Sequence, residues 1–148
     1  MVTFMRRARV AAGMLWATRA RPHVDRCGTA WLIRRFIDPK AEFVFVQPGS
    51  DVPAGAEPFD MPNVKLGHRG KDCTFETVMK EHKLEKDPGL RGVAAIVHDL
   101  DMHENKLPET AGLDAILKGL KLAESDDHKV LDKASALFDA LYARAKGG

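Results

Sequence analysis

The sequence predicts an α+β domain, in which short N-terminal strands form a small sheet packed against four to five helices that dominate the C-terminal half. The early apolar runs are short and bounded by turn residues, as β-strands are. From Asp87 onward, apolar residues recur instead at helical spacing. Strands followed by a succession of helices are typical of an α+β fold rather than of a wound parallel sheet.

The composition is that of an ordinary globular protein, with 148 residues, 45% of them hydrophobic and 30% charged. We expect residues 1–13 to be a loose basic lead-in and residues 14–148 to form a single domain. The net charge of +2 predicts no strong attraction to nucleic acid. Because the positive charge is concentrated in residues 1–40, an anion site is expected in that part of the chain.

The cysteines and the hydropathy pattern predict a cytoplasmic protein. Cys27 and Cys73 do not make a disulfide framework and fit a reducing compartment. No apolar run reaches the length of about 18 residues that a membrane span requires. Arg19 and Arg21 also interrupt the apolar core that a secretory signal needs. We therefore expect no membrane contact, and a homo-oligomer is compatible with the sequence.

The first elements are delimited by cap and turn residues. A strand is predicted over residues 13–18, and a helix is predicted from its N-cap Asp25 to Ile37. The sequence Asp38-Pro39 stops this helix. Between the two elements, Arg21 precedes a proline and is expected to be extended.

Similar signals place the later elements. They are strands over residues 42–46, 58–60 and 64–66, a helix over residues 75–82 capped by Thr74, and helices opened by Asp87-Pro88, by Pro108 and by Ser125 or Asp126. The last helix has the clearest apolar stripe, from Val130 to Tyr142.

The first helix carries an arginine on its apolar face. At about 100° per residue, an apolar stripe is formed on this helix, and Arg26 falls within it. The residues of the stripe are Ala30, Leu32, Ile33, Phe36 and Ile37. An arginine facing the core needs an anionic partner, because an unpaired buried charge is strongly destabilising. Asp99, Asp101 or a bound ligand could supply that anion.

The arginines around this helix indicate an anion-binding site, because guanidinium groups suit bidentate recognition of tetrahedral and carboxylate anions. The residues assigned to this ligand site are Arg19, Arg21, Asp25, Arg26, Trp31, Arg34 and Cys73. The alternative is solvent-exposed charge on apolar stems, which has about even weight for Arg19 and Arg35.

A second cluster contains potential metal ligands. His68 lies on a glycine-rich turn, five residues before Cys73, and Glu76 follows. Imidazole, thiolate and carboxylate are the usual ligands of transition metals. The spacing matches no standard zinc pattern, so a turn-capping histidine and a small buried cysteine are the alternative.

A third cluster is the segment 98–104, which contains three acids and two histidines at a helix exit. Such residues suit metal ligation or general acid–base chemistry, whereas the alternative is a polar helix end with His98 beside the helix dipole. We assign His68, Asp99 and Asp101 to a divalent transition metal of unspecified identity.

The segments singled out above resemble a known family. Trp16-Ala-Thr-Arg-Ala-Arg-Pro22, Asp25-Arg26 and Trp31-Leu-Ile-Arg-Arg-Phe-Ile-Asp38 are similar to the opening signature of the chromate resistance (ChrB-type) proteins. The match continues with Phe59-Asp60, Leu66-Gly-His-Arg-Gly70, Cys73-Thr-Phe-Glu76, Val97 with Asp99 and Asp101, and Phe138-Asp-Ala-Leu-Tyr142. It covers roughly residues 14–145.

The resemblance is to the C-terminal domain of a family associated with chromate-responsive regulation of an efflux operon. Family members are often about twice this length and have an additional N-terminal domain, so no nucleic-acid partner is expected for this chain alone. The resemblance implies a stress-response domain that binds an oxyanion such as chromate, a metal ion, or both, and a sensing role is the expectation. The alternatives are a small metal-dependent redox enzyme and a non-catalytic interaction module, and the residues leave open whether the chain is catalytic.

Overall fold

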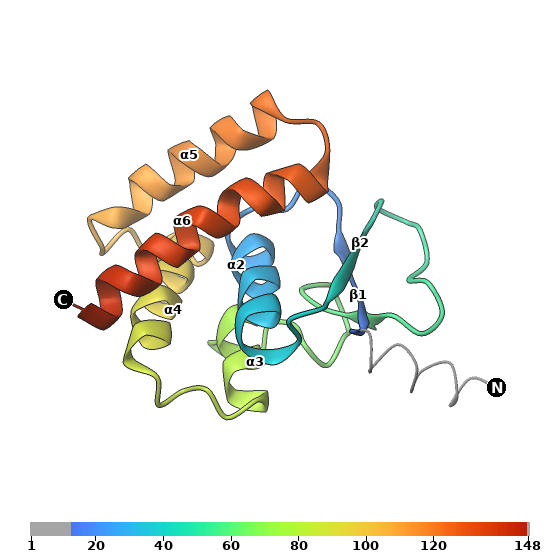
Figure 1. The fold of residues 1–148 in the computed structure, drawn as a ribbon, viewed down its shortest axis with the longest axis horizontal. Coiled ribbons are helices and arrows are strands. Elements are labelled where there is room, and N and C mark those ends of the chain that lie inside the picture. The colour runs from blue at the N-terminus through green and yellow to red at the C-terminus, as the bar shows by residue number, and fades with distance from the viewer. Residues whose placement is uncertain (1–12, 148) are drawn as a thin grey trace.

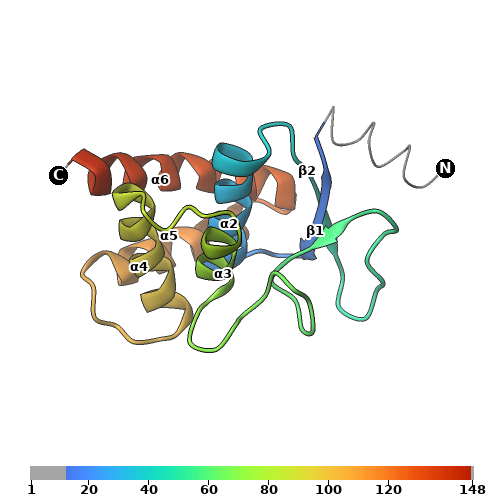
Figure 2. The same ribbon diagram turned by 90° about the horizontal axis from the view of Figure 1, so that it is seen from below.

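The computed structural model describes residues 13–147, so the expected lead-in over residues 1–13 lies outside the described residues except for Gly13. A small sheet lies at one end of the molecule and the helices make up the rest (Figures 1 and 2). The last helix starts beside the sheet and runs to the opposite end of the molecule. The strands come early in the chain and the helices dominate its later part. The predicted α+β class is therefore confirmed.

The sheet is formed by β1 (Leu15–Arg19), β2 (Glu42–Val46) and β3 (Glu57–Pro58), in the order β2-β1-β3. Both neighbours of β1 run parallel to it. Parallel neighbours require a crossover, and the connection from β1 to β2 contains helix α2. The pairing of the strands is therefore non-local.

The chain after β3 is mostly turn. The predicted strand over residues 64–66 is reduced to one parallel bridge between Phe59 and Leu66. Phe59 is fully buried, so the start of this turn segment is anchored in the core. Asp60 follows with a φ of 52°, in the left-handed region that aspartate tolerates. This turn segment places His68 beside Asp25 and Asp101.

Helix α2 (Val24–Leu32) has His23, not Asp25, as its N-cap residue. Asp25 lies in the first turn of the helix, and its carboxylate caps a different helix, as described below. The chain continues as a π-helical segment, η1 (Ile33–Ile37). The predicted end of the helix at Ile37 is thus correct, although its last turn is wider than an α-helical one.

Arg21 is not extended as predicted, because its φ is 55°. Its backbone N–H donates to Asp127 Oδ2 at 2.9 Å. Its guanidinium donates to the carbonyl oxygens of Ser125 and Glu124 at 2.9 and 3.0 Å. These long-range hydrogen bonds override the extended preference of a residue before proline.

Four helices complete the fold: α3 (Thr74–Glu81), α4 (Pro88–Asp101), α5 (Glu109–Ala123) and α6 (Asp127–Gly147). The N-cap residue of α3 is Cys73, one residue before the predicted Thr74. Glu76 Oε1 accepts the Cys73 N–H at 3.0 Å, so a capping-box carboxylate is present after all.

Helix α4 begins as predicted, since Asp87 Oδ1 accepts the N–H of Leu90 at 3.1 Å and Pro88 occupies the first turn. It continues to Asp101, so residues 98–101 are helical rather than part of a loop. Before α6, Asp126 Oδ1 accepts the N–H of His128 at 2.9 Å, as a cap does.

Trp31 lies at the centre of the hydrophobic core and is only 2% exposed. Its indole ring stacks with Phe75 and Phe138 at centroid distances of 6.4 and 5.8 Å, and its Nε1–H donates to Asp139 Oδ1 at 2.8 Å. A Cβ at Gly28 would lie 3.2–3.3 Å from these two phenylalanine rings, so the glycine permits α2 to pack closely. The core thus holds α2 against α3 and α6.

None of the helices within residues 13–147 combines the length and the apolar composition needed to cross a bilayer.

Candidate functional site

The arginines of the predicted anion site are held by different carboxylates. The ion pairs are Arg21–Asp127, Arg26–Asp60, Arg34–Asp132 and Arg35–Asp139, whereas Arg19 is half-buried at the end of β1. Arg21 lines a hollow of about 470 Å³ with Lys118 and Lys121, and Arg34 lines a separate one of about 210 Å³. The structure therefore does not bring these guanidinium groups together in one pocket.

Arg26 pairs with Asp60, a residue that the sequence argument did not consider as its partner. Its Nε lies 3.3 Å from Asp60 Oδ2 and donates to the Asp60 carbonyl oxygen at 3.3 Å. The Arg26 side chain is 31% exposed, so it lies at the edge of the apolar stripe rather than in the core. The expectation of Asp99 or Asp101 as its partner is wrong, because a helical projection shows the direction of a side chain but not what faces it.

Three carboxylates converge on the imidazole of His68. His68 Nε2 lies 3.2 Å from Asp25 Oδ2, 3.0 Å from Asp101 Oδ2 and 3.9 Å from Asp60 Oδ1. These acids come from α2, from the last residue of α4 and from the turn after β3. We refer to Asp25, Asp60, His68 and Asp101 as the Asp/His cluster.

Asp25 is the most buried member of the Asp/His cluster, with 3% of the residue exposed. Its carboxylate caps α3 by accepting the N–H groups of Thr74 and Phe75, each at 2.9 Å. Burial, followed by the charges of Asp60 and Asp101, raises the pKa of Asp25 to about 7. The two backbone donors oppose this shift without cancelling it.

Asp101 is half-buried, and burial is also the main cause that raises its pKa. Its Oδ2 is buried and accepts no hydrogen bond from the described residues, although the His68 ring is close. Within the Asp/His cluster, Arg26 pairs with Asp60 and two backbone N–H groups reach Asp25, so Asp101 is the member whose buried oxygen lacks a donor among the described residues. His68 is 49% exposed, so a solute can reach the cluster from solvent.

Asp99, assigned to the same metal site by sequence, is not part of the cluster. Its carboxylate accepts the N–H groups of Lys106 and Leu107 at 2.8 and 3.0 Å, and also the Thr110 hydroxyl. The hydrogen bond from Thr110 is the largest cause that lowers the pKa of Asp99. Asp99 and Asp101 are two positions apart on α4, so they point to different sides of the helix.

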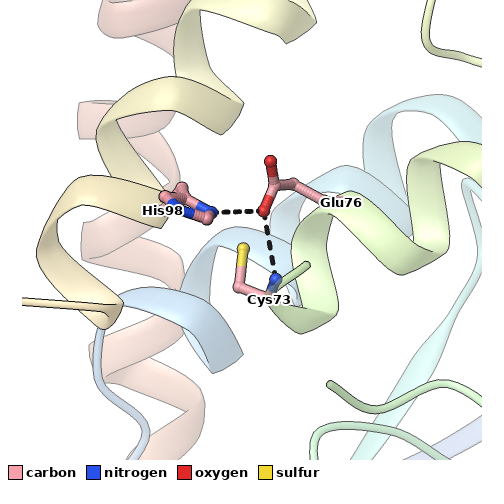
Figure 3. A group of neighbouring side chains, drawn as sticks. All are labelled: Cys73, Glu76 and His98. Atoms are coloured by element: carbon pink, nitrogen blue, oxygen red, sulfur yellow. Dashed lines mark hydrogen bonds and ion pairs between the residues drawn. The ribbon is translucent and has the colours of Figure 1, made fainter. Parts of the chain in front are cut away.

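Cys73, Glu76 and His98 form a second group, which we call the Cys/Glu/His cluster (Figure 3). His98 Nδ1 lies 2.6 Å from Glu76 Oε1, and one ligand atom of each residue lies within 4.8 Å of the others. Burial raises the pKa of the Cys73 thiol, and the hydrogen bond to Glu76 raises the pKa of His98.

Asp60, Glu76 and His98 were not among the residues assigned to a site, although the sequence had grouped Glu76 with Cys73 and placed His98 in a segment suited to metal ligation. Glu76 stands three residues after Cys73, and His98 opens the acidic segment at the end of α4, so both were visible as polar residues. Nothing in the sequence signals that Asp60 lies beside His68, because that contact depends on the turn after β3.

Comparison with known proteins gives one family. The family described as "ChrB, C-terminal domain" matches residues 16–145. The protein named "Protein ChrB" from Cupriavidus metallidurans is 35% identical over 130 residues, which cover 88% of this chain and 40% of that protein. The chain thus spans less than half the length of this curated relative. No solved structure matches the chain.

Proposed function

Since the chain belongs to the family of the ChrB C-terminal domain, we propose that it is a metal-binding domain with a role in chromate resistance, and that the Asp/His cluster is its cation site. The observation that carries this proposal is the convergence of three carboxylates on His68, one of which, Asp101, has a buried oxygen that accepts no hydrogen bond from the described residues. A divalent cation would supply the missing positive charge.

The ligands indicate the class of cation. Three carboxylates and one imidazole form an oxygen-rich set, which suits Mn²⁺ or Fe²⁺ better than an ion that prefers thiolates. The exposed His68 would move with its turn to coordinate the ion, whereas Asp25 is fixed by its backbone hydrogen bonds to α3.

An oxyanion ligand is less well supported. A chromate dianion bound by the arginines would have to compete with Asp60, Asp127 and Asp132 for their guanidinium groups. These carboxylates would also repel a dianion. We therefore do not include an anion in the proposed function.

A cation at the Asp/His cluster would couple binding to stability. It would join α2, the turn after β3 and the end of α4, which are distant in sequence. A ligand that binds only the folded state at 100 times its Kd stabilises it by about 2.7 kcal/mol. Such coupling would let metal occupancy alter how these three segments are held together, which is a property that a metal-responsive sensor domain requires.

The test is a titration with Mn²⁺ of protein prepared without a metal-affinity tag. Free Mn²⁺ is followed by electron paramagnetic resonance, which loses intensity when the ion binds. We expect saturable binding in the wild type and at least about a tenfold weaker Kd in Asp101→Asn, because a carboxylate ligand is lost. The matched control is Asp132→Asn, an exposed aspartate on α6 that contacts Arg34.

The proposal would be contradicted by the absence of saturable Mn²⁺ binding in the wild type, or by an unchanged Kd in a folded Asp101→Asn variant. Equal weakening in Asp101→Asn and Asp132→Asn would also contradict it, since that result would indicate a general effect of net charge. Circular dichroism of each variant verifies that the fold is retained.

A further inference from the structure

We propose that the Cys/Glu/His cluster is a second metal site, which takes a thiolate-binding divalent cation of the Zn²⁺ or Co²⁺ class. Its ligands are Cys73 Sγ, a Glu76 carboxylate oxygen and His98 Nδ1. This site shares no ligand with the Asp/His cluster, so it does not depend on the function proposed above.

The three side chains already face one another. Figure 3 shows the Cys73 sulfur directed into the space between the His98 ring and the Glu76 carboxylate. A tetrahedral ion with bonds of about 2.0–2.3 Å holds its ligand atoms roughly 3.3–3.8 Å apart. Since the three ligand atoms lie within 4.8 Å of one another, side-chain adjustments on the order of 1 Å would place them around one ion.

Helix capping alone does not account for the cysteine. Serine, threonine, aspartate and asparagine are the effective N-cap residues, because their oxygens accept backbone hydrogen bonds strongly. A thiol is a weak acceptor, so Cys73 is a poor choice if its only task is to cap α3. A sulfur beside an imidazole and a carboxylate at this position is instead a set of ligands for a borderline or soft cation.

The surroundings of His98 match those of a metal-bound histidine. Such histidines commonly direct their second ring nitrogen to a carboxylate, which fixes the ring and its tautomer. His98 Nε2 lies 3.4 Å from Glu104 Oε2 while Nδ1 faces Glu76. Glu104 thus occupies the place of the orienting carboxylate, and Lys106 Nζ lies 3.5 Å from its other oxygen.

The site has a route to solvent and room for a fourth ligand. Glu76, His98 and Glu104 line an open hollow of about 280 Å³, whereas Cys73 lies fully buried behind them. Three protein ligands with an open position are typical of zinc sites that keep a bound water. On binding, the Cys73 thiol proton and the proton shared by His98 and Glu76 would leave to solvent.

The test is Co²⁺ absorption spectroscopy of the reduced full chain, prepared without a metal-affinity tag. Co²⁺ bound to a thiolate gives a near-ultraviolet charge-transfer band, and a four-coordinate site gives intense visible bands. We expect both in the wild type at one equivalent of Co²⁺ and loss of the charge-transfer band in Cys73→Ser. The matched control is Cys27→Ser, which removes the other buried cysteine and leaves the band intact.

A second variant, Glu76→Gln, tests the site independently if Cys73→Ser does not fold. Glu76→Gln keeps an acceptor for the Cys73 N–H, because glutamine also serves in a capping box, but it loses the anionic ligand. We expect it to fold and to bind Co²⁺ at least about tenfold more weakly. Absence of the band in the wild type, its persistence in Cys73→Ser, or unchanged affinity in Glu76→Gln would overturn the proposal. An Mn²⁺ titration that shows no binding would not overturn this proposal, since that titration tests the Asp/His cluster.

Discussion

Asp25 and Asp99 are two aspartates with the same 3% exposure, yet their environments have opposite effects. Each carboxylate accepts two backbone N–H groups at 2.8–3.0 Å. The pKa of Asp99 is lowered, chiefly by the Thr110 hydroxyl, whereas burial and the charges of Asp60 and Asp101 raise that of Asp25 to about 7. The two carboxylates thus differ in what surrounds them: Asp99 accepts an additional hydrogen bond from the Thr110 hydroxyl, whereas Asp25 is desolvated and faces the charges of two further carboxylates.

The largest expected effect on stability is that of Asp99→Ala. The substitution leaves the N–H groups of Lys106 and Leu107 and the Thr110 hydroxyl without their acceptor. We expect the free energy of unfolding to fall by about 4–5 kcal/mol, since each of the three donors left unsatisfied costs about 1–3 kcal/mol. Mn²⁺ binding by the folded protein should be retained, because Asp99 lies outside the Asp/His cluster. Thermal unfolding and the Mn²⁺ titration measure the two quantities. Loss of Mn²⁺ binding at a temperature where the variant is folded would contradict this expectation, because it would show that Asp99 also supports the Mn²⁺ site.

The next effect is a dependence of stability on pH in metal-free protein. Folded Asp25, with its pKa raised to about 7, holds its proton up to that pH, whereas the unfolded residue releases it near its ordinary pKa of 3.8. The folded state therefore binds more protons between these values, and its stability falls as pH rises through this window, by on the order of 4 kcal/mol at most. For Asp99 the sign is opposite, because its stabilisation is present above its usual pKa and is lost as pH falls.

Urea unfolding at a series of pH values, with a chelator present, measures this dependence. Subtraction of the Asp25→Asn profile from that of the wild type isolates the contribution of Asp25, since other titrating groups are common to both. A flat difference between pH 4 and pH 7 would show that the neighbours of Asp25 do not destabilise its charged form.

Much of the helical part of the fold was predictable because its signals are local. Asp87-Pro88 opens α4 and Asp126 caps α6, as the sequence indicated. The pairing of the strands was not predictable, since five-residue strands such as β1 carry no information about which neighbour they join. Arg21 shows the same limit, because contacts with the start of α6 set its backbone.

The candidate site was predictable only in part, for the same reason. His68 and Asp101 were assigned to one site from the sequence, and the structure brings them to 3.0 Å of each other. Asp25 was expected to cap its own helix, but its carboxylate reaches the N-terminus of α3, about 50 positions along the chain. Asp99 looked equivalent to Asp101 because composition does not show that α4 turns them apart.

The smallest effect is that expected for Asp101→Asn in metal-free protein. The charge of Asp101 raises the pKa of Asp25 less than burial or Asp60 does. Its removal should therefore lower the pKa of folded Asp25 without returning it to the ordinary value. It should stabilise the protein near pH 8 by less than about 1 kcal/mol. The measurement is the same series of urea unfolding curves, with Asp132→Asn as the control, because that exposed aspartate should leave the window unchanged.

The Asp101→Asn substitution would thus weaken Mn²⁺ binding while slightly stabilising the metal-free fold, as expected of a ligand held against electrostatic repulsion. Destabilisation by Asp101→Asn comparable to that of Asp99→Ala would instead place Asp101 among the structural carboxylates.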